Sequence, residues 1–261
     1  MIEVKNLRKS FEDKEVLKGI STNFEAGKTN LIIGQSGSGK TVFLKCLNGL
    51  ISPSSGEILF NGIDTSKYNY DQQRKLRSEI GTVFQGSALF DSMSVLENVR
   101  FPLEMFSNLS LKEMNNRAGN VLERVNLTTE SFTKFPSEIS GGMQKRVAIA
   151  RALVNHPKYL FVDEPNSGLD PQTSMVIDKL LHELTVEYNT TTIINTHDMN
   201  SVMEIGETII FLKNGIKEWS GNKSEILTAE NESVIDFVYS SKLFTKLREV
   251  LLIEKQQKSS K

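Results

Sequence analysis

A short stretch near the N-terminus has the residue types and spacing of a phosphate-binding loop. It reads Gly34-Gln35-Ser36-Gly37-Ser38-Gly39-Lys40-Thr41, the pattern G-x-x-x-x-G-K-T. Glycines let the backbone approach a phosphate closely, and successive N–H groups then form a cradle for the anion. Lys40 can reach the β- and γ-phosphates of a nucleotide, and the Thr41 hydroxyl can bind Mg²⁺. The loop therefore predicts a site for ATP or GTP and Mg²⁺.

The residues around this loop have the pattern that such a loop requires. Asn30-Leu31-Ile32-Ile33 is typical of a buried strand, and apolar residues follow Lys40 at helical spacing up to Leu50. A helix that starts at the loop directs its positive end at the same phosphate. The alternative, a glycine turn that matches by chance, does not explain this strand–loop–helix order. Cys46 lies among the apolar residues of the helix and is predicted to be a small core residue.

Two further groups of residues can complete the chemistry. Tyr159–Val162 is typical of a buried strand and leads directly into Asp163 and Glu164. Ligands bind at the carboxyl ends of such strands, so Asp163 is predicted to hold Mg²⁺ through water and Glu164 to orient or deprotonate an attacking water. Ser140-Gly141-Gly142 opens a predicted helix and bares N–H groups for a second anion. An ordinary serine-capped helix is the structural alternative.

Composition limits the classes of protein to which the chain can belong. The chain has 261 residues, a net charge of −1 and a sequence pI of about 6.4, without the basic excess of a dedicated nucleic-acid binder. It contains no apolar run of the roughly 18–20 residues that a membrane span needs. Met1–Lys5 resembles an alternating strand and not a signal peptide. We therefore expect a cytoplasmic protein that reaches a membrane only through partners.

The order of patterns along the chain predicts an α/β fold. Residues 1–84 are rich in strand signals, residues 87–157 are helical, and residues 158–228 return to β/α order. Asn61-Gly62 and Asn214-Gly215 are predicted to form hairpin turns. Ser110 and Glu113 form the pattern of a capping box. A further helix is expected from residue 231.

Taken together, these motifs resemble the nucleotide-binding subunit of ABC transporters over residues 1–228. The phosphate loop matches Walker A, residues 159–164 match Walker B, and four further motifs follow in the family order: Gln85 for the Q-loop, Ser140–Gln144 for the signature, Ser167–Asp170 for the D-loop, and His197 for the switch histidine. The resemblance implies an ABC-type P-loop ATPase with a RecA-like core, an antiparallel β subdomain and an inserted α-helical subdomain at about 87–157. Residues 229–261 are expected to form a C-terminal helical extension.

The resemblance also implies roles for individual residues toward ATP and Mg²⁺. Phe11 would stack on the adenine, Gln85 would approach Mg²⁺ with Thr41, and His197 would contact the γ-phosphate. Catalysis would depend on Glu164, His197, Lys40 and Gln85. Ser140, Gly141 and Gly142 would bind the ATP of a partner chain, and Asp170 would couple the two sites. The chain departs from the family pattern at Ile139, Met143 and Asn166, none of which removes a catalytic group.

The implied partners are a second copy of the chain, joined in the ATP-bound state, and an integral-membrane permease. The segment Ala88–Leu103, with the signature region Ser140–Val147, is similar to the ATPase of Mce-associated phospholipid transporters. Accessory and substrate-binding lipid-transport subunits would then be further partners, and nucleic acid would not be one. The protein would be peripheral on the inner face of the cell membrane.

Several alternatives remain at this point. The chain can be an importer ATPase for another small substrate, a non-transport ABC ATPase that acts on DNA or ribosomes, a P-loop kinase or GTPase, or an inactive regulatory cassette. The C-terminal stretch carries an apolar seam at Phe237, Phe244, Leu247 and Leu251. This seam is expected to pack on its own domain or to contact a second subunit or an accessory protein. We predict that truncation after Ser233 leaves a folded, ATP-binding core but weakens dimerisation or complex assembly.

Overall fold

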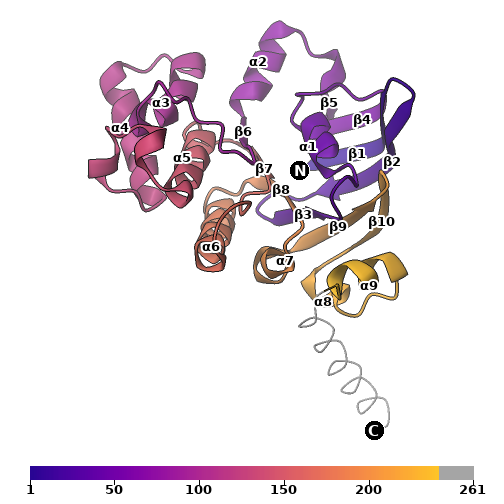
Figure 1. The fold of residues 1–261 in the computed structure, drawn as a ribbon. Coiled ribbons are helices and arrows are strands. Elements are labelled where there is room, and N and C mark those ends of the chain that lie inside the picture. The colour runs from indigo at the N-terminus through magenta and orange to yellow at the C-terminus, as the bar shows by residue number, and fades with distance from the viewer. Residues whose placement is uncertain (241–261) are drawn as a thin grey trace.

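The computed structural model describes residues 1–240 as two β-sheets with helices around them (Figure 1). The strands are β1 Ile2–Phe11, β2 Lys14–Phe24, β3 Thr29–Ile33, β4 Ser55–Phe60, β5 Ile63–Asp64, β6 Ile80–Val83, β7 Tyr159–Asp163, β8 Thr191–Thr196, β9 Thr208–Lys213 and β10 Ile216–Gly221. The α-helices are α1 Lys40–Leu47, α2 Tyr70–Ser78, α3 Val95–Phe106, α4 Leu111–Arg124, α5 Gly141–Leu153, α6 Pro171–Glu187, α7 Met199–Ile205, α8 Lys223–Ile226 and α9 Glu232–Val238. Short 3₁₀ turns lie at Thr65–Lys67, Thr129–Ser131 and Pro136–Glu138.

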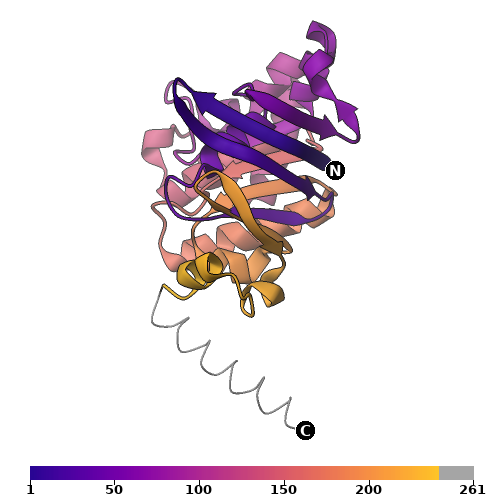
Figure 2. The ribbon, with the colours of Figure 1, turned by 90° about the vertical axis from the view of Figure 1, so that its right-hand side faces the viewer.

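The two sheets differ in strand direction. The four-stranded sheet has the order β2-β1-β4-β5 and is antiparallel throughout. The six-stranded sheet has the order β10-β9-β3-β8-β7-β6, and its strands run parallel except for the β9–β10 hairpin. After a quarter turn, Figure 2 shows the indigo strands of the antiparallel sheet in front of the rest of the chain. Because β3, β8, β7 and β6 are parallel, their carboxyl ends share one edge of the larger sheet.

Alternate residues of the parallel strands point into two separate hydrophobic cores, as the two-residue repeat of a strand requires. Ile32, Phe161 and Ile193 face a core that also holds α1 and the antiparallel sheet. Their neighbours Leu31, Leu160 and Ile194 face the second core, with α6 and α7. Burial on both faces explains why these strands read as continuous apolar runs in the sequence.

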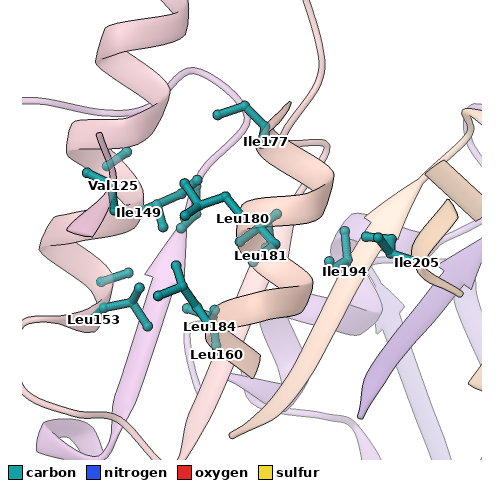
Figure 3. Packing of buried hydrophobic residues seen from close by; sticks show 14 of the residues in the cluster. Val125, Ile149, Leu153, Leu160, Ile177, Leu180, Leu181, Leu184, Ile194 and Ile205 are labelled. Carbon is teal, nitrogen blue, oxygen red and sulfur yellow. The ribbon is translucent and has the colours of Figure 1, made fainter. Parts of the chain in front are cut away.

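The second core joins the large sheet to the helical part of the chain. Leu180, Leu181 and Leu184 of α6 pack toward Leu160 and Ile149, as Figure 3 shows. The helices α3, α4 and α5 form a group at one end of the molecule (Figure 1), with α3 packed against both of the others. This group lies within the stretch expected to be an inserted helical subdomain.

Most local predictions agree with the structure. Ser110 and Glu113 form the capping box at α4, Cys46 is buried, and both Asn-Gly turns have the positive φ values of a type I′ hairpin. Leu50 is an exception, because α1 ends at Leu47 and Leu50 is 57% exposed. Within residues 1–240, no helix is both long and apolar enough to span a bilayer.

The helix α2 was not predicted, although its start carries a clear signal. Asn69 and Gln72 form a reciprocal capping box at its N-terminus. None of its residues is buried, so the helix has no apolar face that a periodicity analysis could detect.

The helix expected near residue 231 is α9, and it belongs to the second core. Val234 and Val238 are fully buried, and the Phe237 ring lies 5.3 Å from the Phe211 ring, centroid to centroid. Lys213 Nζ also donates to Ser233 Oγ over 2.6 Å. Phe237 therefore packs on its own domain, whereas Phe244, Leu247 and Leu251 lie outside the described residues.

Candidate nucleotide site

The predicted site residues follow the carboxyl ends of four of the parallel strands. The phosphate loop, residues 34–41, comes after β3, Gln85 after β6, Glu164 after β7 and His197 after β8. Parallel strands place these ends on a common edge, where α/β sheets bind ligands. The fold therefore gathers residues that are up to 163 positions apart in the sequence.

The phosphate loop has a backbone that only its glycines allow. A Cβ at Gly34 would lie 2.2 Å from the Leu212 carbonyl oxygen, so the loop passes β9 too closely for any side chain. Gly39, the N-cap of α1, has a φ of 105°, in the left-handed region that favours glycine. The loop ends at the N-terminus of α1, whose free N–H groups favour an anion.

Lys40 is held inside this loop. Its ammonium donates to the carbonyl oxygens of Gly34 and Gln35 over 2.8 and 3.1 Å, and the residue is 5% exposed. Burial lowers the Lys40 pKa, and the nearby carboxylates of Glu164 and Asp163 oppose that effect. A buried ammonium that lies next to bare amide groups provides positive charge for a polyphosphate.

The loop also contains a buried polar atom without a partner. Ser38 Oγ is buried and has no hydrogen bond in the structure, an arrangement that costs free energy until a ligand or water supplies one. A phosphate oxygen has the chemistry to do so. The donor set of the phosphate loop therefore fits a nucleotide.

Two of the three residues expected to hold Mg²⁺, Thr41 and Asp163, also meet at this edge, whereas Gln85 contacts Glu164 and Ser167. The Thr41 hydroxyl donates to Asp163 Oδ1 over 3.3 Å, and Asn195 Nδ2 donates to the same oxygen over 2.9 Å. Within the described residues, no group of three or more His, Cys, Asp and Glu side chains could hold a metal. A site of one carboxylate and one hydroxyl nevertheless fits Mg²⁺, which takes its remaining ligands from water and substrate phosphates. Asn195, which fixes the carboxylate, was missed, although an amide at the end of a buried strand was a visible signal.

Glu164 is the centre of a cluster of polar side chains. Its Oε1 lies 3.2 Å from His197 Nδ1, and its Oε2 accepts from Gln85 Nε2 over 3.1 Å. Gln85 Nε2 also donates to Ser167 Oγ over 3.3 Å. Glu164 has a φ of 45°, which is unusual for a residue other than glycine. Such a backbone conformation persists only where contacts with the surrounding structure fix it. The cluster thus binds the loops after β6, β7 and β8 to one another.

Lys145 is a further member of this cluster that the sequence did not suggest. It lies on α5, just after the signature motif, and its ammonium donates to the Gln85 carbonyl oxygen. Burial lowers the pKa of Lys145, and Asp163 and Glu164 oppose that effect. The predicted signature helix is therefore tied to the Q-loop within one chain.

The signature residues themselves occupy a different place. Ser140 Oγ caps α5 by accepting from the Met143 N–H over 3.3 Å. A Cβ on Gly142 would lie 2.9 Å from Thr173 Cγ2, so this turn packs against the start of α6. A Cβ on Gly141 would lie 3.9 Å from Leu169 Cδ2, at ordinary van der Waals distance. No hydrogen bond among the described residues joins Ser140 or these glycines to residues 34–41.

Asp170 and Phe11 are placed by local structure. Asp170 is the N-cap of α6 and accepts from the Thr173 N–H and hydroxyl over 3.0 and 2.5 Å, bonds that lower the Asp170 pKa. Phe11, at the end of β1, is 43% exposed, with Lys9 Nζ 4.8 Å from the ring centroid. Because the ring is exposed, Phe11 is not a core-packing residue.

Comparison with known proteins agrees with this arrangement. Residues 17–167 match the ABC transporter family. The chain is 42% identical to the lipoprotein-releasing system ATP-binding protein LolD of Buchnera aphidicola, over 78% of this chain and 91% of that protein. It is 37% identical to the methionine import ATP-binding protein MetN 1 of Oceanobacillus iheyensis, over 92% of this chain and 72% of that protein.

A solved structure with the same fold connects the site to ATP hydrolysis. It is the dimeric post-hydrolysis state of the ATP-binding cassette MJ0796 bound to ADP and Pi, with a TM-score of 0.78 and 35% identity over 85% of this chain and 99% of that chain. The kinase, GTPase and inactive-cassette alternatives do not survive these findings. The chain belongs to the ABC transporter family as an ATP-binding subunit, a Mg²⁺-dependent ATPase.

Proposed function

We propose that this ATPase powers a permease that moves phospholipid across or between bacterial membranes. The similarity of Ala88–Leu103 and Ser140–Val147 to Mce-associated ATPases supports this proposal. The 42% identity to a protein named for lipoprotein release is a second, weaker support. Import of a small substrate is the alternative, favoured by the 37% identity to a protein named for methionine import.

We assign Glu164 the role of general base in this reaction. A general base must lie within hydrogen-bond reach of the water that it activates, and its carboxylate is held by Gln85 and His197 at the edge of the site. Lys40 and the N–H groups of the phosphate loop neutralise phosphate charge, which is the larger part of catalysis in phosphoryl transfer. Bound Mg²⁺, held by Thr41, Asp163 and Gln85, would supply further neutralisation of charge.

A groove beside the Q-loop supports the permease contact that Ala88–Leu103 predicts. The groove encloses about 290 Å³, and most of its lining is apolar, including Phe84, Ala88, Phe90 and Met105. Phe90 is 41% exposed, and its ring lies 4.9 Å from that of Phe101. Arg151 secures the edge of the groove by donating to the carbonyl oxygens of Ala88 and Ser87. Met93, in the same segment, is half-buried.

Substitution of Phe90 tests this contact. An aromatic anchor in such a groove typically contributes about 2 kcal/mol or more to binding, so F90E is expected to weaken permease binding by at least roughly tenfold. Co-purification from membranes measures that binding, and hydrolysis by the isolated chain serves as the reference. L111E is the matched control, because Leu111 is also exposed, at the start of α4 and outside the groove. Equal permease yields for F90E, L111E and wild type would move the contact elsewhere.

The substrate is tested with the permease that co-purifies. The complex is reconstituted in vesicles, and ATP-dependent movement of a labelled phospholipid is compared with uptake of methionine. Phospholipid movement that stops in the E164Q complex would support the proposal. Methionine uptake without phospholipid movement would favour the importer alternative.

A further inference from the structure

A buried polar cluster lies next to the loop after β7, which carries Glu164. The cluster has no part in the proposed binding of ATP or of the permease. Asn166 Nδ2 donates to Asp178 Oδ1 over 2.8 Å and to Ser201 Oγ over 3.0 Å. Ser201 lies beside Asp178 as well, and interaction with its hydroxyl lowers the pKa of Asp178. Asp178 and Ser201 are 3% and 2% exposed. Three elements therefore meet in one network: the loop after β7, the helix α6 and the helix α7.

Each arm of this network leads to a catalytic residue. Asn166 lies two positions after Glu164 and next to Ser167, which accepts from Gln85. Ser201 lies in the first turn of α7, whose N-cap Asp198 directly follows His197. Asp178 belongs to α6, which is anchored in the second core by Ile177, Leu181 and Leu184. The carboxylate thus connects a rigid helix to both partners of the 3.2 Å contact between Glu164 and His197.

This cluster of polar residues lowers the stability of the folded protein. Asp178 is not in an ion pair with any lysine or arginine of residues 1–240. The charged groups that act on it, Asp198 and Glu204, are both acidic and both raise its pKa. Lys179, the neighbouring cation, lies 3.7 Å from Glu204 instead. Asn166 Oδ1 is buried without a hydrogen bond. An apolar contact here would be less costly than an unpaired buried carboxylate.

We propose that Asp178 is a positioning residue that, through Asn166 and Ser201, fixes Glu164 relative to His197. An ionised carboxylate accepts from both donors at once and so orients both. A protonated carboxyl, or an asparagine, replaces one of the two acceptor oxygens by a donor, so it cannot accept from both neighbours as the carboxylate does. The strained backbone of Glu164, with a φ of 45°, needs such fixed surroundings.

This role predicts an acid limit on hydrolysis. Burial raises the pKa of Asp178 to about 6, the hydrogen bonds from Ser201 and Asn166 oppose that rise, and the charges of Asp198 and Glu204 add to it. The activity of the wild type should therefore decline as the pH falls through about 6, when the network loses its acceptor. The inference rests on the role proposed above for Glu164.

The test compares kcat and KM for ATP between pH 5 and 8.5 in the full-length chain, with its permease where the isolated chain turns over slowly. D178N is expected to lower kcat by about tenfold at pH 8, as loosened positioning does, with KM within about twofold, and to lose the acid limb near pH 6. S201A removes a hydrogen bond that favours the carboxylate, so its acid limb should move to higher pH. E183Q is the control, because Glu183 is an exposed acid on the same helix, and it should behave as wild type.

The outcomes separate this inference from the proposed function. A D178N protein with the kcat of the wild type and an unchanged decline near pH 6 would overturn the positioning role. If D178N does not fold, an S201A protein whose activity declines at the same pH as the wild type would overturn it. Loss of hydrolysis in E164Q with normal D178N would leave the role of Glu164 intact and remove only the positioning role. Wild-type hydrolysis in E164Q would remove both.

Discussion

Glu164 shows how much of this site is decided by single residues. Its carboxylate contacts Gln85 and His197, and its backbone adopts a strained conformation at the end of a fully buried strand. Such strain persists only where the surroundings fix it. The acids at 163 and 164 could be predicted from the sequence because a run of four apolar residues leads directly to them.

The partners of Asn166 could not be predicted in the same way. Asp178 and Ser201 lie 12 and 35 positions further along the chain, and their helices present them to Asn166 only after packing. In sequence, a single Asp among Ile177, Lys179 and Leu180 is typical of an exposed position on an amphipathic helix. Contacts between separate elements carry no local pattern, and this is why Lys145 was missed too.

The burial of Asp178 predicts that D178N is the more stable protein near neutral pH. A rise in pKa from 3.8 to about 6 corresponds to a cost of roughly 3 kcal/mol for the ionised native state, at about 1.4 kcal/mol per unit. The cost is absent below pH 3.8, where both states are protonated, grows as the pH rises to about 6, and is then constant. The advantage of D178N in urea denaturation should therefore shrink as the pH is lowered from 7 to 4.5.

That result would separate positioning from ordinary structural support. A residue that only supports the fold loses activity and stability together when it is replaced. In D178N we expect lower kcat with an equal or higher urea midpoint at pH 7. A lower midpoint than that of wild type at pH 7 would contradict the calculated cost of the buried charge.

At the scale of elements, burial decides which predictions are confirmed. The strands β3, β7 and β8 are buried at every position, and their apolar, β-branched runs could be identified directly. The exposed helix α2 has only its capping box as a signal, and it was missed. The phosphate loop could be predicted residue by residue because its chemistry is local to one strand–loop–helix unit.

The helix α9 makes a specific prediction about truncation. Removal of everything after Ser233 would delete Val234, Phe237 and Val238 from the core, and the loss of one buried Phe alone typically costs about 3–5 kcal/mol. We therefore expect truncation after Ser233 to yield an unstable or insoluble protein, and this replaces the folded core that the sequence pattern predicted. Truncation after Ser240 keeps these side chains and should keep the thermal midpoint and the ATP affinity of the full chain.

The second truncation also tests the extension itself. Any loss of permease complex or of dimer in the chain that ends at Ser240 is attributable to residues 241–261, because the core remains complete. Unchanged yields of both would leave the extension without a role in assembly. A soluble, stable protein that ends at Ser233 would show that α9 contributes less to the core than its burial indicates.

At the scale of the whole molecule, the two expected halves of a nucleotide site lie apart in one chain. The phosphate loop lies at the carboxyl edge of the large sheet, whereas Ser140 and Gly142 lie beside the start of α6. Two copies in head-to-tail contact would bring the signature of each to the phosphate loop of the other. The related cassette that holds ADP and Pi is dimeric, which agrees with this arrangement.

This geometry predicts that E164Q forms a closed homodimer with ATP. The amide keeps the shape of the site but cannot act as a base, so hydrolysis should fall by roughly 10²–10⁴-fold, the range that loss of a general base typically produces, while ATP binding persists. Size-exclusion chromatography with light scattering should show a dimer with Mg-ATP and a monomer with Mg-ADP. The double variant E164Q/S140R is the matched control, because an arginine at the signature turn obstructs the second copy without touching residues 34–41 of its own chain. An E164Q protein that binds ATP yet stays monomeric would contradict a nucleotide site shared by two chains. In a monomer, the signature residues Ser140 and Gly142 would not reach the ATP.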